Sequence, residues 1–251
     1  MADLWSPGSL AIVAATFLVA GLVKGVIGLG LPTVAVAVLA ATIGLKPAMA
    51  LLLVPAFATN LWQSLVGGAL REILRRLGTL LIGIFVGTWA GVRVLAGADV
   101  RYLVALLGAL LAAYATVSLL KVRIRHRHGS EPWLSPVMGT VNGVLTGMTG
   151  SYGIPALLYI QAMDFPRDPF VQALGVLFLA STVALALGLG GQDLISADQA
   201  LLSAGAVAPA LLGMALGARI RYRLSEAVFR KTFFVSLLVL GVYLAVRAQW
   251  V

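Results

Sequence analysis

The sequence predicts an all-α polytopic membrane protein with two inverted-topology repeats, each a broken-helix hairpin followed by three transmembrane helices. Three observations predict this fold: the composition, the lengths of the apolar segments and an internal alignment of the two halves. The 251-residue chain is 61% apolar and 11% charged, whereas soluble domains are about 45–50% apolar and about 25% charged. A soluble fold of this composition would expose apolar surface that it cannot bury.

The net charge of +9 does not indicate nucleic acid. The basic residues cluster in short loops between apolar segments, chiefly at Arg71–Arg76, Lys121–Glu131 and Arg219–Lys231. This is the positive-inside pattern of membrane proteins. The expected partner is therefore a lipid bilayer, the inner or plasma membrane of the cell. The chain has no cysteine, so thiolate metal sites are excluded, and we expect no metal and no cofactor. No basic residue precedes Lys24, so we expect the first apolar segment to be retained rather than cleaved as a signal peptide.

Most of the apolar segments are close to the roughly 20 residues that one helical crossing of the membrane needs. If the loops richest in lysine and arginine are cytoplasmic, these segments alternate in direction and both termini lie outside the cytoplasm. The predicted single crossings are 47–68, 77–96, 102–120, 169–190, 199–218 and 230–250.

Two apolar segments, 9–43 and 133–163, are too long for one helix and too short for two complete crossings. The orientation argument requires each to return to the side from which it started. Each contains a glycine cluster followed by proline, at Gly28–Pro32 and Gly147–Pro155. We therefore predict two hairpins of short or broken helices that meet near the middle of the membrane.

The two halves of the chain align with each other. They comprise a first transmembrane repeat at 1–120, a basic cytoplasmic linker at 121–132 and a second repeat at 133–251. In this alignment Lys24 corresponds to Asn142. A shared pattern with opposite orientation is an inverted repeat, an architecture of secondary transporters that bind substrate near the midplane at discontinuous helices.

Small residues also recur inside the predicted spans, at Gly83, Gly87 and Gly91 and again at Gly213 and Gly217. Such spacing allows close packing of helices in lipid, and we interpret these glycines as packing positions. The same faces permit a homodimer without requiring one.

The helix breaks are the predicted binding site. A helix that restarts after Pro32 or Pro155 points free backbone N–H groups at the midplane, and helix N-termini bind anions. Lys24 adds a full positive charge, and an ionisable residue inside a span is a functional candidate; the alternative is that it snorkels to the interface. All nine carboxylates lie in loops or at span ends, which favours a small anionic substrate. The predicted substrate-binding residues are Lys24, Gly28, Gly30, Leu31, Pro32, Thr33, Asn60, Gln63, Asn142, Thr146, Thr149, Gly150, Ser151, Tyr152, Gly153, Pro155 and Gln172.

The stretch Lys-Gly-Val-Ile-Gly-Leu-Gly-Leu-Pro-Thr at 24–33 and its partner at Gly143–Pro155 resemble the sulfite exporter TauE/SafE family. The resemblance spans essentially the whole chain, although the second stretch is looser, with an insertion of three residues around Thr149–Ser151. It implies a plasma-membrane permease that exports sulfite or small organosulfonates such as sulfoacetate. Because members of the family handle varied sulfur-containing anions, the resemblance leaves the cargo open.

A secondary transporter is the leading hypothesis, and an anion channel is the alternative, since a channel can use the same broken helices. An intramembrane enzyme is disfavoured, because no predicted span contains a paired carboxylate or a Ser/His/Asp set for acid–base chemistry. The histidines, His126 and His128, both lie in the basic linker, where a solvated loop is the expected environment. The sequence leaves the direction of transport and the coupling ion open.

Overall fold

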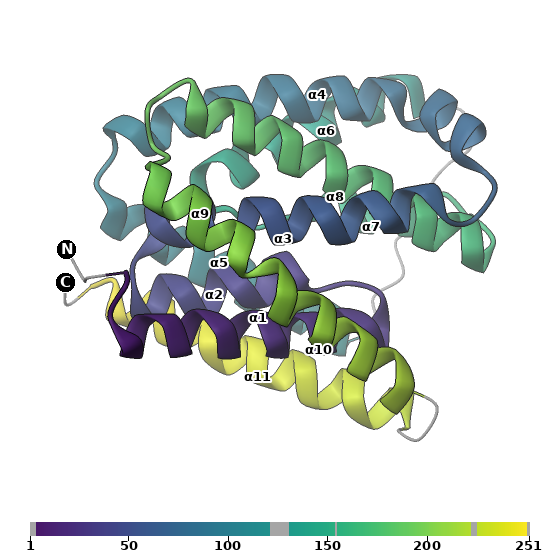
Figure 1. Ribbon diagram of the computed structural model, residues 1–251. Coiled ribbons are helices and arrows are strands. Elements are labelled where there is room, and N and C mark those ends of the chain that lie inside the picture. The colour runs from purple at the N-terminus through teal and green to yellow at the C-terminus, as the bar shows by residue number, and fades with distance from the viewer. Residues whose placement is uncertain (1–3, 121–130, 154, 222–224, 250–251) are drawn as a thin grey trace. The chain divides into compact units, whose positions relative to one another are not determined.

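A computed structural model describes residues 4–120, 131–153, 155–221 and 225–249, and these residues form helices and connecting turns without a strand. Seven of the helical segments are long and apolar enough to cross a membrane. The prediction of an all-α, multi-pass membrane protein is therefore confirmed. The helices (Figure 1) are α1 (Pro7–Ile27), α2 (Leu31–Thr42), α3 (Leu45–Leu65), α4 (Leu70–Gly97), α5 (Val100–Leu119), α6 (Glu131–Thr149), α7 (Ala156–Gln161), α8 (Arg167–Gly190), α9 (Ala197–Gly205), α10 (Val207–Ile220) and α11 (Glu226–Arg247).

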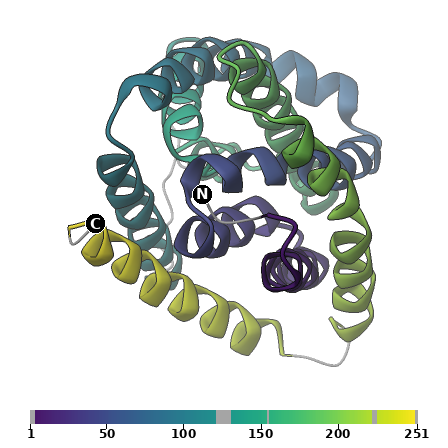
Figure 2. The ribbon, with the colours of Figure 1, turned by 60° about the vertical axis from the view of Figure 1, so that its left-hand side comes forward.

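Each predicted single crossing is confirmed as a helix or a helix pair. Helices α9 and α10 continue one another across a bend (Figures 1 and 2) and together provide the crossing predicted at 199–218. The bend falls just before Pro209, whose ring removes a backbone donor from the first turn of α10. Helix α4 begins at Leu70, so the prediction of a loop at Arg71–Arg76 was wrong. Arginine, leucine and glutamate favour helix, and the charged side chains extend the helix beyond its apolar part.

The two predicted breaks are present, but the helices before them are longer than expected. Helix α1 has 21 residues and qualifies as a full crossing, and α6 has 19 residues. The helices after the breaks are short, with 12 residues in α2 and six in α7. Of the predicted hairpins of short or broken helices, the breaks are therefore confirmed, but α1 and α6 are not short, because the apolar pattern does not show where within a long segment the break falls.

The chain forms two compact units, and each draws on both halves of the sequence. Helix α3 contributes to both, with the division directly after its internal proline, Pro55. The division between units therefore does not follow the division between the two predicted repeats. Unit 1 comprises Met1–Pro55, Asp99–Val122 and Leu194–Val251, and unit 2 comprises Ala56–Ala98 and Arg123–Asp193.

Within unit 1, helices α1 and α10 are in backbone contact through glycines. A Cβ atom added at Gly21 would lie 2.1 Å from the carbonyl oxygen of Ala210, and one at Gly213 would lie 2.0 Å from that of Leu18. Only glycine permits this approach, because such distances are shorter than any Cβ contact. Gly217 completes the contact against Leu22 and Gly25.

Within unit 2, α4 and α6 pack in the same way, and the two helices run together in Figure 1. Added Cβ atoms at Gly83, Gly87 and Gly91 would lie 2.1–2.6 Å from carbonyl oxygens of α6. The interpretation of the span glycines as packing positions is thus confirmed. These small-residue faces, which suggested a homodimer, are already covered by helices of their own units.

Candidate functional site

The contacts in the two units match each other residue for residue. In unit 2, a Cβ atom at Gly91 would contact the carbonyl oxygen of Val144 at 2.2 Å and the Cα atom of Gly147 at 3.0 Å. In unit 1, a Cβ atom at Gly217 would make the same two contacts, with Leu22 at 2.2 Å and Gly25 at 3.0 Å. Gly25 therefore corresponds to Gly147.

This register pairs Lys24 with Thr146. The alignment of Lys24 with Asn142 was wrong by one helical turn. The helix ends confirm the correction, since the Gly28 N–H donates to the Lys24 carbonyl oxygen and the Gly150 N–H donates to that of Thr146, both at 2.7 Å.

Both helices end because a glycine adopts a left-handed backbone conformation. The φ angle is 78° at Gly28 and 68° at Gly150, and a second left-handed glycine follows at Gly30 and at Gly153. Side chains other than glycine rarely adopt this conformation, so it ends a helix at low cost mainly at glycine. Pro32 then falls two residues after Gly30, and Pro155 two residues after Gly153. The second break is therefore longer than the first by one residue, and the expected insertion of three residues was too large.

The break in unit 1 lies beside a buried lysine. Lys24 is 4% exposed and occupies the last turn of α1, where a positive charge is favoured by the helix dipole. Such burial does not fit the alternative of a side chain that snorkels to the surface. Helix α2 then begins with Leu31 and Pro32, both buried, and no side chain caps its N-terminus. Thr33 is also buried, at 5% exposure. This break therefore combines a buried cation with an uncapped helix start.

The break in unit 2 is held by threonine side chains. The Thr146 hydroxyl donates to the carbonyl oxygen of Ser151 at 3.1 Å, and the Ser151 N–H donates to the Thr149 hydroxyl oxygen at 3.2 Å. Tyr152 and Gly153 follow and are buried. After Pro155 the helix α7 has only six residues, which is too short for a dipole comparable with that of α2. The two breaks therefore differ, since the second offers hydroxyl and amide groups instead of charge.

The predicted glutamines lie together in unit 2, but their amides already have backbone partners. The Gln63 side chain donates to the carbonyl oxygen of Val171, and the Gln172 side chain donates to that of Ser64, each at 2.9 Å. The Ala69 N–H donates to the Gln172 side-chain oxygen at 2.8 Å. These bonds tie the end of α3 to the start of α8. Both side chains would have to give up these bonds to contact a substrate. The third predicted residue of α3, Asn60, is fully buried.

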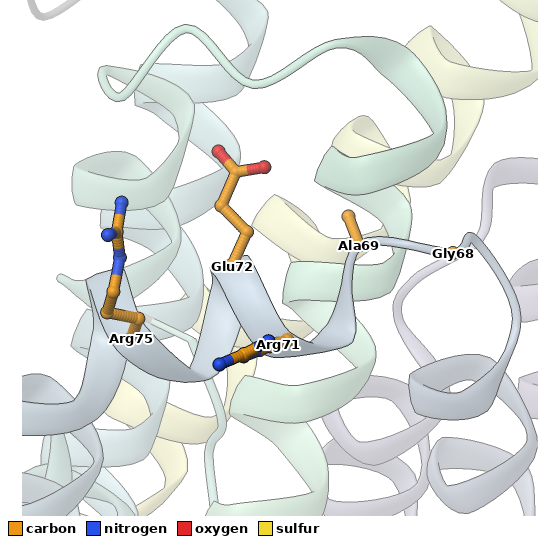
Figure 3. Close-up of a pocket in the computed structure, with 5 residues that line it drawn as sticks. All are labelled: Gly68, Ala69, Arg71, Glu72 and Arg75. Carbon is orange, nitrogen blue, oxygen red and sulfur yellow. The ribbon is translucent and has the colours of Figure 1, made fainter.

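An open pocket of about 480 Å³ lies at the start of α4, and none of the predicted site residues lines it. Figure 3 shows Glu72 and Arg75 extending to the same side of the helix while Arg71 points another way. These residues form the first turns of α4, where the basic loop was expected. The pocket is therefore a feature of a charged helix end and not of either break. It is lined by Gly68, Ala69, Arg71, Glu72 and Arg75.

No group of three His, Cys, Asp or Glu side chains lies together among the described residues. His126 and His128, with most of the predicted linker, lie outside the described residues.

Helices that break at glycine–proline clusters inside a multi-pass helical protein are typical of membrane transporters. The chain matches the model of a protein family described as "Sulfite exporter TauE/SafE" over residues 13–244. The protein therefore belongs to the TauE/SafE family of membrane transporters, and the predicted resemblance is confirmed. No curated protein and no solved structure matches the chain.

Proposed function

We propose that this protein is a secondary transporter that exports small sulfur-containing anions, such as sulfite or organosulfonates, across the cell membrane. The observation that carries the proposal is the buried Lys24 in the last turn of α1, just before the break between α1 and α2. The membership of the chain in the sulfite exporter family supports it. A buried ammonium group inside a span is costly, and ionisable residues in such positions usually mark a functional site. An anionic substrate would offset that cost.

The first break supplies two sources of positive potential in the same segment. The N-terminus of α2 carries about half a positive charge, and no side chain caps it at Gly30. Lys24 lies one turn before Gly28. A small oxyanion can accept hydrogen bonds from both sources, which are the ordinary means of anion binding at a helix start. We place the substrate at this break, with Leu31, Pro32 and Thr33 beside it.

The transport mechanism in this proposal follows from the repeated contacts in the two units. We propose that the two halves are inserted with opposite orientation, with both termini outside the cytoplasm, and that alternating access exposes the site to each side in turn. The matched glycine contacts of α1 with α10 and of α6 with α4 support an internal repeat. The protein in this view is a carrier and not an enzyme, as membership of a transporter family supports.

The test is sulfite efflux from proteoliposomes that contain the purified protein. Lys24→Met should abolish efflux, and Lys24→Arg should retain part of it because the charge is kept. Lys231→Met is the matched control, since Lys231 is an exposed lysine on α11, and its efflux should equal that of the wild type. Efflux from Lys24→Met at the wild-type rate would contradict the proposal. Stimulation of efflux by external sulfite is expected for a carrier, and its absence together with single-channel currents would indicate a channel instead.

A further inference from the structure

Unit 2 contains three fully buried polar side chains whose hydrogen-bonding capacity is unused. They are Thr88 on α4, Asn142 on α6 and Ser181 on α8, each with no exposed surface. The hydroxyl oxygens of Thr88 and Ser181, and both the nitrogen and the oxygen of the Asn142 amide, have no hydrogen-bond partner within the part of the chain that the structure describes. Asn142 is among the substrate-binding residues predicted from the sequence, whereas Thr88 and Ser181 are not in that set.

Such groups are expensive in a membrane protein. A buried polar group without a partner costs about 1–3 kcal/mol, and no bulk water reaches the hydrocarbon region to compensate it. Neighbouring Thr140, Thr149 and Thr182 avoid this cost, because each donates to a carbonyl oxygen of its own helix. Thr88, Asn142 and Ser181 therefore need a bound water molecule or a ligand.

The packing of unit 2 brings α4 and α6 together at Thr88 and Asn142. A Cβ atom at Gly143 would lie 2.7 Å from the backbone nitrogen of Thr88, and one at Gly147 would lie 2.4 Å from its carbonyl oxygen. Thr88 thus lies against the turn of α6 that follows Asn142. One turn further along α4, Val92 contacts Gly188 of α8, at 2.9 Å from an added Cβ atom, and Ser181 lies two turns before Gly188 on that helix.

Asn142 also belongs to a polar stripe that leads to the break. Asn142, Thr146 and Thr149 follow each other at a spacing of four and three residues, which places them on one face of α6. Thr146 and Thr149 bond to Ser151 in the break. The unused amide of Asn142 therefore lies on the helix face that leads to the unwound segment.

The Asn142 amide specifies the kind of ligand. Both its nitrogen and its oxygen are unpaired, so the ligand needed here is the same whichever way the amide is turned. The nitrogen needs an acceptor and the oxygen needs a donor. An anion that has only acceptor atoms, such as sulfate or a sulfonate, would leave the amide oxygen unpaired. An oxyanion that carries one proton satisfies both atoms.

No charged side chain is buried in the described part of unit 2, so none competes with this recognition. On the helices packed against α6, the charged groups are Arg71, Glu72, Arg75, Arg76 and Arg93 of α4 and Arg167 and Asp168 of α8, all exposed or half-buried. The buried titratable side chains are Tyr159, whose hydroxyl bonds Ser135 at 2.5 Å, and Tyr152.

We infer that unit 2 provides a second binding position for the substrate, in addition to the break in unit 1. Hydrogen sulfite, the singly protonated form of the oxyanion, binds there through the Asn142 amide, and Thr88 contributes its hydroxyl group. This inference rests on the proposed function and adds the protonation state of the substrate. Neutral donors and acceptors suit a hydrogen-bonded monoanion that delivers its own proton to the site.

The experiment measures the affinity of the purified full-length protein for sulfite, sulfate and methanesulfonate by calorimetry. It is done at one pH below and one pH above the second pKa of sulfurous acid. Sulfite should bind about tenfold more tightly on the acid side, where hydrogen sulfite predominates, because one hydrogen bond to a charged ligand is then gained. Methanesulfonate, a monoanion with acceptors only, should bind more weakly and without this pH dependence.

Asn142→Leu and Thr88→Val should each remove the preference for sulfite over methanesulfonate. Thr140→Val should keep it, because Thr140 lies on the same helix and bonds its own backbone. If sulfite and methanesulfonate bind the wild-type protein equally at both pH values, the inference is overturned and the unused groups hold water, while the proposed function stands. This comparison uses the wild-type protein alone, so it does not depend on whether a variant folds. If none of the three anions binds, the proposed function itself fails.

Discussion

The Thr146 hydroxyl donates a hydrogen bond to the carbonyl oxygen of Ser151, so the last turn of α6 holds the start of the break that follows it. The corresponding position in the first unit is Lys24. Equivalent positions in the matched glycine contacts thus carry a hydroxyl group that fixes the backbone in unit 2 and an ammonium group in unit 1.

Replacement of Thr146 by valine should therefore loosen the break in unit 2. The change leaves the buried Ser151 carbonyl oxygen without this donor, at a cost of about 1–3 kcal/mol. We expect a lower melting temperature and impaired efflux, measured in detergent and in proteoliposomes. Thr146→Ser keeps the hydroxyl group and should resemble the wild type. Normal efflux from Thr146→Val would show that the bond does not support transport.

The glycine contact between α4 and α6 predicts opposite effects of one substitution at two positions of α4. Gly87→Ala places a Cβ atom 2.1 Å from the Thr140 carbonyl oxygen, so the helices must separate, and overpacking of this kind typically costs about 1–3 kcal/mol. A Cβ atom at Gly78 meets nothing within 4 Å, and Gly78→Ala should be neutral or stabilising, because alanine favours helix over glycine by about 1 kcal/mol. Thermal denaturation followed by size-exclusion chromatography measures both. Equal stability of the two variants would contradict the packing.

The left-handed conformation of Gly28 predicts which residues can replace it. A Cβ atom there meets no other atom within 4 Å, so backbone strain alone limits the substitution. Gly28→Asn should retain most efflux, because asparagine tolerates this region, whereas Gly28→Val should lose it, because β-branched residues do not. The matched efflux assay in proteoliposomes distinguishes the two. Full efflux from Gly28→Val would mean that α1 does not need to end at this residue.

The loop between α4 and α5 predicts a small pH dependence of stability. The pKa of Asp99 is lowered, first by the hydrogen bond from the Arg101 backbone N–H and then by that from its side chain. A carboxyl group with a lowered folded-state pKa stabilises the fold above its unfolded pKa of about 3.9, and this stabilisation is lost as pH falls through the folded value. Asp99→Asn should therefore narrow the difference in melting temperature between neutral and acidic pH. An unchanged pH profile would show that the contribution is negligible.

Local patterns predicted the helices and their breaks well. Uninterrupted apolar stretches gave the single crossings, and the clusters around Gly28 and Gly150 gave the breaks, because these features depend on a few adjacent residues. The register between the halves could not be obtained in the same way. Glycines recur every fourth residue in both α1 and α6, so two alignments one turn apart place the same residue type at the packing positions. The contacts of Gly91 and Gly217, together with the equivalent helix ends at Gly28 and Gly150, distinguish them.

The candidate site was harder to predict than the fold. Gln63 and Gln172 are polar residues inside spans, and composition alone does not show that their amides are bonded to the backbone. Thr88 was missed for the opposite reason, since a threonine beside Gly87 is an ordinary member of a small-residue helix face. Its unused hydroxyl group becomes evident only when the partners available within unit 2 are known.

The glycine contact between α1 and α10 has a consequence for synthesis. Helix α1 is synthesised long before α10, the helix against which it packs. During translation the glycine face of α1 therefore stays uncovered in the bilayer or in the insertion machinery until α10 has been made. A nascent chain that stops before Val207 would carry an incomplete first unit, and we expect quality-control proteases to remove it.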